Sequence, residues 1–381
     1  MVKSKSEPES KLRNSGGQGC IFDPAIPCKG YKTASKKKKS KKDKKAKTSK
    51  KDKKAKKDKK TISKVSFHET SARREIEMDD VVRKIKGHED WAILWDKMCM
   101  TPTYKELAKH SEIDKCLDKK QIPKSPEKRF PQLIGPFGGH TYYEQGLSEF
   151  SKTTFKSQTT FDKALLSMCR LLKGACLGIR ELRAHKLVHG DISVRNVLVK
   201  DDKSYLIDFG LAYRSSNKTY IKAHLKFLME GTDKIYDAYP YEYYLYHGHH
   251  NKAKLKEELS DMKRGVMRDY HEEHVRFHEL ILDKKDIDQE LQDYKERVIK
   301  GTYTPDLHQV IVGVDTYSVG ILLPTVIHDV AEEHGVAFET VHTLCRDTKH
   351  PEVFKLLRDM TEFYAEARIS PEKAYERLCE I

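Results

Sequence analysis

The feature that most constrains this chain is a short polar stretch that follows a long helical pattern. The letters HGDISVRN run from His189 to Asn196, and DFG occupies 208–210 after an apolar strand pattern. An Asp and an Asn five residues apart on a tight loop suit two roles at one phosphoryl group, because the carboxylate of Asp191 can accept a hydroxyl proton and Asn196 can bind a metal ion. Asp208, 17 residues after Asp191, can hold the other side of a metal–phosphate cluster.

The flanking patterns predict helices in the C-terminal part of the chain and strands in the N-terminal part. Apolar residues recur at helical spacing over 161–185, directly before the polar stretch. Further helices are expected at 314–323, 351–366 and 371–379, and the charged residues 251–300 also have a helical pattern. In the N-terminal part, residues 15–30 are typical of strand, turn and strand, 62–67 alternate like a strand, and a helix is expected from about Ala72.

A lysine tract accounts for nearly all of the net charge of +15. Residues Lys36 to Lys60 hold 17 lysines and three aspartates, which leaves the rest of the chain near neutral. The tract has almost no apolar residues, so it is predicted to be disordered over 32–60. Lysine charge without aromatic residues favours weak, salt-sensitive contact with nucleic acid or acidic proteins, without base readout.

Eight cysteines are scattered without a CxxC pair, and the N-terminus shows no signal-peptide pattern. No apolar run is judged long enough to span a bilayer. These observations predict a reduced, intracellular protein with no structural disulfide, no zinc knuckle and no membrane contact. Three histidines at 247, 249 and 250 are interpreted as a solvated turn, and the tyrosines from Tyr239 to Tyr246 as packing residues.

The order of these motifs resembles a eukaryotic-type protein kinase. More narrowly, it resembles the divergent kinases of large nucleocytoplasmic DNA viruses, whose N-termini often carry a sequence close to GGQGCIFDPAIPC at 16–28. The resemblance implies an α+β, bilobal fold with a small β-rich lobe over 15–138 and a large helical lobe over 139–381. It leaves 1–14 as a loose N-terminus, with the lysine tract as one insertion and about 247–310 as a charged helical one.

In the small lobe, the resemblance assigns residues to nucleotide binding. The Gly-rich turn would cover the ATP phosphates with its backbone amides, because side chains there would obstruct close approach. Lys64 would pair with the α- and β-phosphates, and a helix glutamate, Glu75 with Glu77 as the alternative, would hold that lysine. The gap between Lys64 and Glu75 is short for the family. The predicted cofactor-binding residues are Gly16, Gly17, Gly19, Ile21 and Lys64.

In the large lobe, the resemblance makes Asp191 the catalytic base and assigns Mg²⁺ to Asn196 and Asp208. Gly190 replaces the arginine that usually reads a phosphate on the activation segment, which predicts activity without a phosphorylated residue docked there. Ser193 replaces the usual lysine. Arg195 is predicted to supply the charge at the γ-phosphate that this lysine would have given.

Further residues of the large lobe match the scaffold of the family. Asp315, in a buried helix, would accept hydrogen bonds from the backbone of the catalytic loop, and Pro324 would kink that helix. Arg368 would pair with a glutamate of the activation segment, Glu242, with Asp306 as the runner-up.

The leading hypothesis is an ATP- and Mg²⁺-dependent protein kinase acting on Ser or Thr of protein substrates, expected as a monomer. One alternative is a small-molecule phosphotransferase, since the His-Gly-Asp motif also occurs in aminoglycoside-type kinases. Another is a pseudokinase or scaffold that binds nucleic acid or acidic partners through Lys36–Lys60. The expected location is intracellular: host cytoplasm, viral factory or virion for a viral protein, or the nucleus because of the lysine tract.

Overall fold

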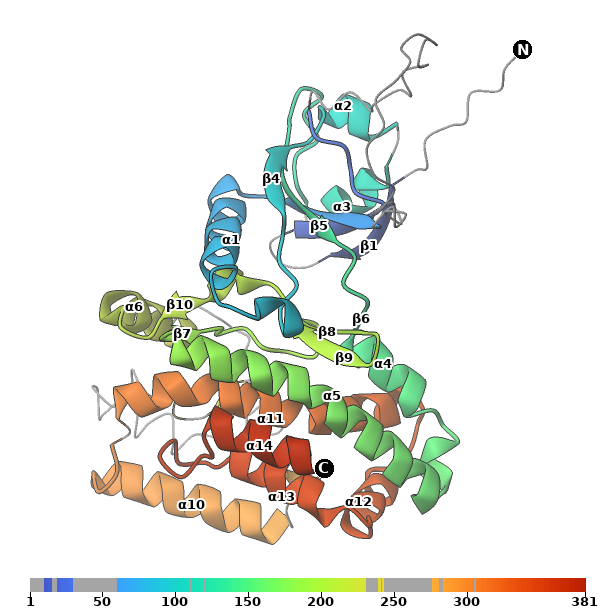
Figure 1. Ribbon diagram of the computed structural model, residues 1–381. Coiled ribbons are helices and arrows are strands. Elements are labelled where there is room, and N and C mark those ends of the chain that lie inside the picture. The colour runs from blue at the N-terminus through green and yellow to red at the C-terminus, as the bar shows by residue number, and fades with distance from the viewer. Residues whose placement is uncertain are drawn as a thin grey trace, which may run out of the picture. The chain divides into compact units, whose positions relative to one another are not determined.

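A computed structural model describes residues 10–15, 19–29, 60–109, 111–119, 121–230, 239–240, 242, 276–280, 284–304 and 306–381. The chain divides into two compact units (Figure 1). Unit 1 comprises Met1–Asp80 and Leu94–Phe137, and unit 2 comprises Val81–Ile93 and Gly138–Ile381. The first is built on a sheet and the second is mostly helical, so the predicted α+β class is confirmed.

Unit 1 contains a five-stranded antiparallel sheet in the order β1-β2-β3-β5-β4. One helix, α1, follows β3 after a two-residue connection, and two short helices, α2 and α3, lie between β4 and β5. The predicted strand at 62–67 and helix from Ala72 correspond to β3 and α1. The bounds are β1 Lys11–Ser15, β2 Gly19–Asp23, β3 Thr61–Ser66, α1 Glu69–Val82, β4 Lys97–Met100, α2 Tyr104–Leu107, α3 Ile113–Lys119 and β5 Pro131–Pro136.

The prediction of a loose N-terminus over 1–14 is wrong for its last residues. Strand β1 begins at Lys11 and pairs with β2, and Leu12 packs against the apolar cluster of unit 1. The amide of Leu12 also donates to Glu112 at 2.9 Å. Backbone pairing supplies the order here that the polar side chains did not indicate. Residues 1–9 lie outside the described residues, as do 32–59 of the predicted disordered insertion.

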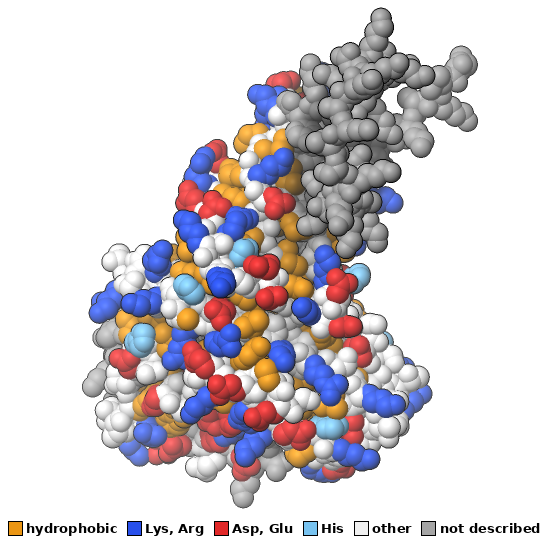
Figure 2. All heavy atoms as spheres, in the orientation of Figure 1, with side chains coloured by type: hydrophobic (Ala, Val, Ile, Leu, Met, Phe, Trp, Pro, Cys, Tyr) orange, Lys and Arg blue, Asp and Glu red, His pale blue; other side chains and the backbone are white. Residues whose placement is uncertain are grey.

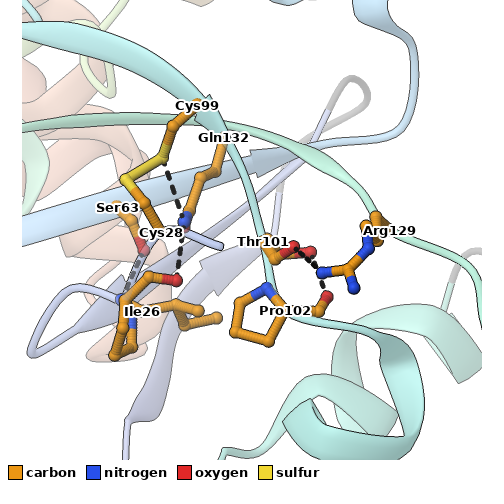
Figure 3. The surroundings of a disulfide bond; sticks show 9 residues. Ile26, Cys28, Ser63, Cys99, Thr101, Pro102, Arg129 and Gln132 are labelled. Atoms are coloured by element: carbon orange, nitrogen blue, oxygen red, sulfur yellow. Dashed lines mark hydrogen bonds between the residues drawn. A yellow bond between two sulfur atoms is a disulfide. The ribbon is translucent and has the colours of Figure 1, made fainter. Parts of the chain in front are cut away.

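Two disulfides correct the prediction that none would occur. Cys20 of β2 is bonded to Cys116 of α3, and Cys28 to Cys99 of β4. Beside the second bond, the Gln132 side chain donates to the Pro27 carbonyl and to Cys99 (Figure 3). The partners are 96 and 71 residues apart in sequence, so only the folded sheet brings them together.

Unit 2 consists mainly of helices, with short strands around the predicted catalytic loop. The long helix predicted at 161–185 is α5, and it packs against α14 and β9. The bounds are β6 His140–Thr141, α4 Tyr142–Glu149, α5 Gln158–Ala184, β7 Leu187–Val188, β8 Val197–Lys200, β9 Lys203–Leu206, β10 Tyr213–Arg214, α6 Lys218–Glu230, α10 Lys284–Lys300, α11 Leu307–Glu333, α12 Phe338–Arg346, α13 Pro351–Met360 and α14 Pro371–Glu380.

Helix α11 forms the centre of unit 2 and is longer than predicted. It continues through Pro324, whose neighbours on both sides are buried. Such burial outweighs the roughly 3 kcal/mol that an interior proline costs a helix. Among the described residues, α11 is long and apolar enough to cross a membrane, which corrects the prediction that no run was. Because 89% of its apolar 18-residue stretch is buried, the helix fits the role of a core helix.

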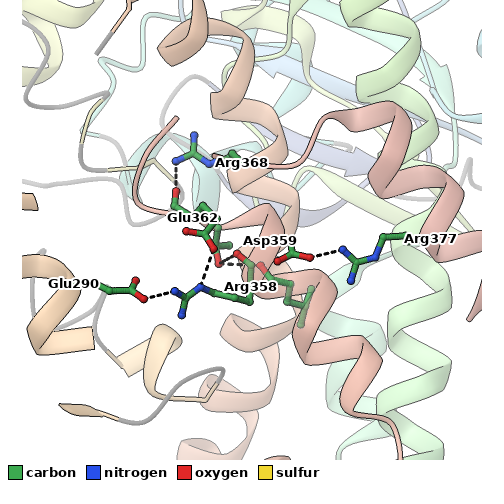
Figure 4. A network of polar contacts seen from close by, with 8 residues as sticks. Glu290, Arg358, Asp359, Glu362, Arg368 and Arg377 are labelled. Atoms are coloured by element: carbon green, nitrogen blue, oxygen red, sulfur yellow. Dashed lines mark hydrogen bonds and ion pairs between the residues drawn. The ribbon is translucent and has the colours of Figure 1, made fainter. Parts of the chain in front are cut away.

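Helix α10, within the predicted insertion at 247–310, is tied to the rest of unit 2. Its apolar residues belong to a buried cluster that also contains residues of α6 and α11. Arg358 of α13 donates to Glu290 of α10 and to Glu362, and Arg377 of α14 pairs with Asp359 (Figure 4). The inserted helix is therefore part of the core. Most of 247–283 lies outside the described residues, including the histidines at 247, 249 and 250.

The face shown in Figure 2 carries basic and acidic side chains intermixed over the described surface. Ile299 is the one large hydrophobic residue counted as exposed among the described residues. This agrees with a body that is near neutral outside the lysine tract.

Candidate phosphoryl-transfer site

The predicted ion pair of the small lobe is present in unit 1. The Nζ of Lys64 on β3 lies 2.8 Å from Oε2 of Glu75 on α1, with Lys64 7% and Glu75 1% exposed. The other carboxylate oxygen of Glu75 accepts from the indole N–H of Trp95 at 2.6 Å. Both oxygens are thus satisfied away from water, which a buried ion pair requires to offset its desolvation.

The short connection between β3 and α1 explains why Lys64 and Glu75 can form an ion pair although only 11 residues separate them. Helix α1 begins at Glu69, so Glu75 lies on its second turn, while Glu77 is exposed and is not the partner. Trp95 was not singled out from the sequence. Its backbone N–H donates to Asp79 at 2.7 Å and its indole to Glu75, so it contacts two carboxylates of α1.

The predicted phosphate-covering residues are only partly described. Gly16 and Gly17 lie outside the described residues. A Cβ on Gly19 would lie 2.3 Å from the Val65 carbonyl oxygen, so the close approach of β3 by itself requires glycine there. Ile21 pairs across the strands with Lys64, which places both side chains on one face of the sheet. Contact of these residues with a nucleotide stays a prediction.

In unit 2, the two residues that define the motif contact each other. The side-chain amide of Asn196 donates to Oδ2 of Asp191 at 3.0 Å and to the Asp191 carbonyl at 2.8 Å. The turn from Ser193 to Asn196, closed by a 3.0 Å backbone hydrogen bond, makes this contact possible. Because both bonds use the amide nitrogen of Asn196, its Oδ1 remains the atom suited to a metal ion.

His189 is a buried anchor below this loop. Its Nε2 lies 3.1 Å from the Ile207 carbonyl, and its Nδ1 accepts from the Asp191 amide at 3.3 Å, which together define a neutral ring with the proton on Nε2. Burial lowers the pKa of His189 to about 4. The ring also packs on Phe209 with centroids 4.8 Å apart. His189 therefore orients Asp191 and joins the catalytic loop to the DFG sequence.

Asp208 occupies a left-handed backbone conformation, with φ 62° and ψ 66°. Non-glycine residues rarely adopt it, and such positions cluster at functional sites. The amide of Ile207 donates to the Asn196 carbonyl at 3.1 Å, which ties the strand leading to Asp208 to the catalytic loop. Among the described residues, no group of three His, Cys, Asp or Glu side chains could hold a metal ion; the predicted ligands are one Asn and one Asp.

Asp315 of α11 has the scaffold role predicted for it. Its two oxygens accept from the backbone N–H groups of His189, at 2.7 Å, and Gly190, at 2.9 Å. Burial raises the pKa of Asp315 to about 6, against the opposing effect of these two donors. The predicted pairing of Arg368 with Glu242 is also confirmed, at 2.7 Å and fully buried. Asp306 instead caps the N-terminus of α11.

Arg195 is exposed on the turn of the catalytic loop. It forms no ion pair with any other described residue, and its predicted role at the γ-phosphate stays a prediction. Tyr239 was interpreted from the sequence only as packing, but its hydroxyl donates to the Gly190 carbonyl. Tyr239 lies three residues before Glu242 in the YPYE sequence at 239–242, but neither this sequence nor the surroundings of Trp95 indicated the hydrogen bond that each residue makes.

A comparison with protein-family models matches residues 28–229 to protein tyrosine and serine/threonine kinases. The matched region covers more than half of the chain and includes Lys64, Glu75, Asp191, Asn196 and Asp208. The chain belongs to this kinase family.

Two curated proteins are similar to parts of this kinase. A probable bifunctional tRNA threonylcarbamoyladenosine biosynthesis protein of Methanospirillum hungatei is 36% identical over 91 residues, 23% of this chain and 17% of that protein. The EKC/KEOPS complex subunit BUD32 of Debaryomyces hansenii is 33% identical over 81 residues, 21% of this chain and 31% of that protein. The chain thus spans under a third of the length of either relative. Neither relative is viral, so the narrower viral resemblance gains no support from them.

Proposed function

We propose that this kinase uses ATP and Mg²⁺ to phosphorylate Ser or Thr residues of protein substrates. The observation that carries the proposal is the Asp191–Asn196 contact on a loop whose backbone is held by Asp315. The buried Glu242–Arg368 pair supports a protein kinase over a small-molecule phosphotransferase of the His-Gly-Asp type, because the latter enzymes generally lack that activation-segment scaffold.

The residues present suit Mg²⁺, which prefers oxygen ligands. Oδ1 of Asn196 and the carboxylate of Asp208 would hold it. When bound, Mg²⁺ neutralises charge on the transferred phosphoryl group.

The contacts of Asp191 and Lys64 support a role for each. Asp191 would accept the proton of the substrate hydroxyl, while the Asn196 amide keeps its carboxylate oriented. Lys64 would bind the α- and β-phosphates, held in place by Glu75 and indirectly by Trp95. Catalysis would thus rest on positioning and charge neutralisation rather than on a covalent intermediate.

A peptide array with radiolabelled ATP and a phosphoamino-acid readout tests this proposal. We expect label on Ser or Thr, dependent on Mg²⁺ and lost in Asp208→Asn. Label on tyrosine alone would overturn the proposed specificity. Transfer only to small alcohols assayed in parallel would favour the alternative phosphotransferase.

A second candidate function follows from the names of the two relatives, which concern tRNA modification and a KEOPS complex. The kinase would then act on or beside tRNA, with the 17 lysines of the tract contacting phosphates. Filter binding of tRNA at several salt concentrations tests this, with deletion of 36–60 as the control. Binding should be weak, fall steeply with salt and vanish in the deletion; binding that survives the deletion contradicts the assignment to the tract.

A further inference from the structure

The backbone of Gly190, immediately before the predicted catalytic base, is held at both of its polar groups. Its N–H donates to Asp315 at 2.9 Å, and its carbonyl oxygen accepts from the Tyr239 hydroxyl. Tyr239 is 2% exposed, so this bond is shielded from water. The two peptide groups that flank Gly190 are therefore both held, which leaves little freedom for Asp191, the next residue.

The side-chain position at 190 is closed by a second tyrosine. Gly190 has φ +69°, and a Cβ there would lie 3.0 Å from Cε1 of Tyr213. An arginine at this position would meet both backbone strain and the Tyr213 ring. The place where a related kinase carries a phosphate-reading cation is thus occupied by the activation segment itself.

The inserted helix α10 belongs to the same buried cluster as both tyrosines. That cluster contains Val188, Tyr213 and Tyr239 from around the loop. It also contains the buried residues of α10, which are Ile287, Leu291, Tyr294 and Val298. Burial of these apolar side chains stabilises the cluster by an amount that grows with the buried area.

We infer that Tyr239 is a positioning residue, which fixes the catalytic loop through its hydroxyl and takes the place of a phosphorylated activation-segment residue. The inference rests on the proposed phosphoryl transfer for its effect on turnover, but the contact itself does not. Tyr239 acts on Asp191 through the carbonyl of the peptide group that joins Gly190 to Asp191. Helix α10 contributes by packing in the cluster that buries Tyr239.

The test compares Tyr239→Phe, which removes only the hydroxyl, with Tyr303→Phe as a matched control. Tyr303 is a buried tyrosine of the same cluster, but its hydroxyl donates to Glu366. Two readouts are taken on the full chain: hydrogen exchange of a peptide spanning 189–196, and kcat with KM for ATP after phosphatase treatment.

We expect Tyr239→Phe to exchange faster over 189–196 and to lower kcat by about tenfold, the effect of one buried hydrogen bond, with KM for ATP unchanged. Tyr303→Phe should match the wild type in both readouts. Unchanged exchange or unchanged kcat in Tyr239→Phe overturns the inference, as does a wild type that phosphatase inactivates. If the wild type transfers no phosphate at all, the proposed function fails. Hydrogen exchange alone then decides whether the Tyr239 hydroxyl fixes the catalytic loop.

Discussion

Units 1 and 2 hold their functional residues by different means. In unit 1, two disulfides link β2 and its following segment to α3 and β4, and Lys64 is held by a buried carboxylate. In unit 2, Cys169, Cys176, Cys345 and Cys379 are all free. The catalytic loop is held by its hydrogen bonds to the Asp315 carboxylate, which accepts, and to the Tyr239 hydroxyl, which donates. Covalent links dominate in one unit, and a buried polar network in the other.

The size of the two cores accounts for the contrast. Among the described residues, the apolar cluster of unit 1 joins the sheet to two short helices, α2 and α3, whereas in unit 2 helix α11 packs against α4, α5, α12 and α13. A small unit buries a smaller fraction of its surface and gains more from cross-links. Each unit also holds a buried carboxylate whose oxygens are satisfied, Glu75 in unit 1 and Asp315 in unit 2.

The largest expected effect is on the stability of unit 1. Replacing Cys20 and Cys116 together with Ser should lower its free energy of unfolding by about 4–5 kcal/mol, because the bond closes a loop of about 96 residues. Denaturant unfolding can be followed in each unit separately by tryptophan fluorescence. Trp95 reports on unit 1 in a Trp91→Phe background, and Trp91 on unit 2 in a Trp95→Phe background.

The control for this experiment is Cys379→Ser, which removes an exposed free thiol of unit 2. It should leave both transitions in place. After the Cys20 and Cys116 replacements, an equal loss of unfolding free energy reported by Trp95 and by Trp91 would contradict the contrast between the units.

The second effect concerns the ion pair of unit 1. Lys64→Met leaves the Glu75 carboxylate buried without its cation, which should cost about 3–5 kcal/mol and abolish ATP binding. Adding Glu75→Leu should restore part of the stability but none of the binding. Lys115→Met breaks an exposed pair with Glu112 and should cost under about 1 kcal/mol. Calorimetry with and without ATP measures both quantities; equal costs for the two lysines would refute the proposed importance of burial.

The smallest effect is a pH dependence confined to unit 2. Protonated Asp315 can no longer accept from both loop amides, so kcat should fall about tenfold from pH 7 to pH 5, given its pKa of about 6. The stability of the fold changes with pH in the opposite direction to kcat. Since folded Asp315 binds its proton more tightly than the unfolded chain does, its contribution to unfolding free energy decreases as pH rises from about 3.8 to about 6.

Rate profiles from pH 5 to pH 8 and melting profiles from about pH 4 to pH 8 test this, with Asp315→Asn as the variant and Asp306→Asn as the control. Asp315→Asn should show a smaller change of stability over that window, while Asp306→Asn should follow the wild type. A kcat that stays level from pH 7 to pH 5 would show that the Asp315 carboxylate does not govern the loop.

The contacts that the sequence predicted correctly share one property: each joins residues whose motif is recognisable on its own. Asp191 and Asn196 meet within one loop, and Arg368 meets Glu242 because both belong to the kinase scaffold. Lys64 and Glu75 meet because β3 leads almost directly into α1. Spacing alone placed Asp191 and Asn196 together, whereas the resemblance to protein kinases supplied the other two pairs.

What was missed depends on tertiary packing between segments distant in sequence. The four paired cysteines carry no spacing pattern, and only the sheet register and α3 reveal their partners. The roles of Trp95 and Tyr239 arise from single hydrogen bonds to Glu75 and Gly190, each many residues away. Strand β1 and the continuation of α11 through Pro324 were missed because pairing and burial outweighed local propensity.

The most direct test of the account is phosphoryl transfer from labelled ATP to a Ser/Thr peptide array by the wild type and by Asp191→Asn. We predict transfer by the wild type and a loss of at least about a hundredfold in the variant, with ATP binding retained, because Asp191 acts on the substrate proton and not on the nucleotide. Equal transfer by both proteins, or none by a wild type that binds ATP and Mg²⁺, would contradict the assignment of this loop as the catalytic site.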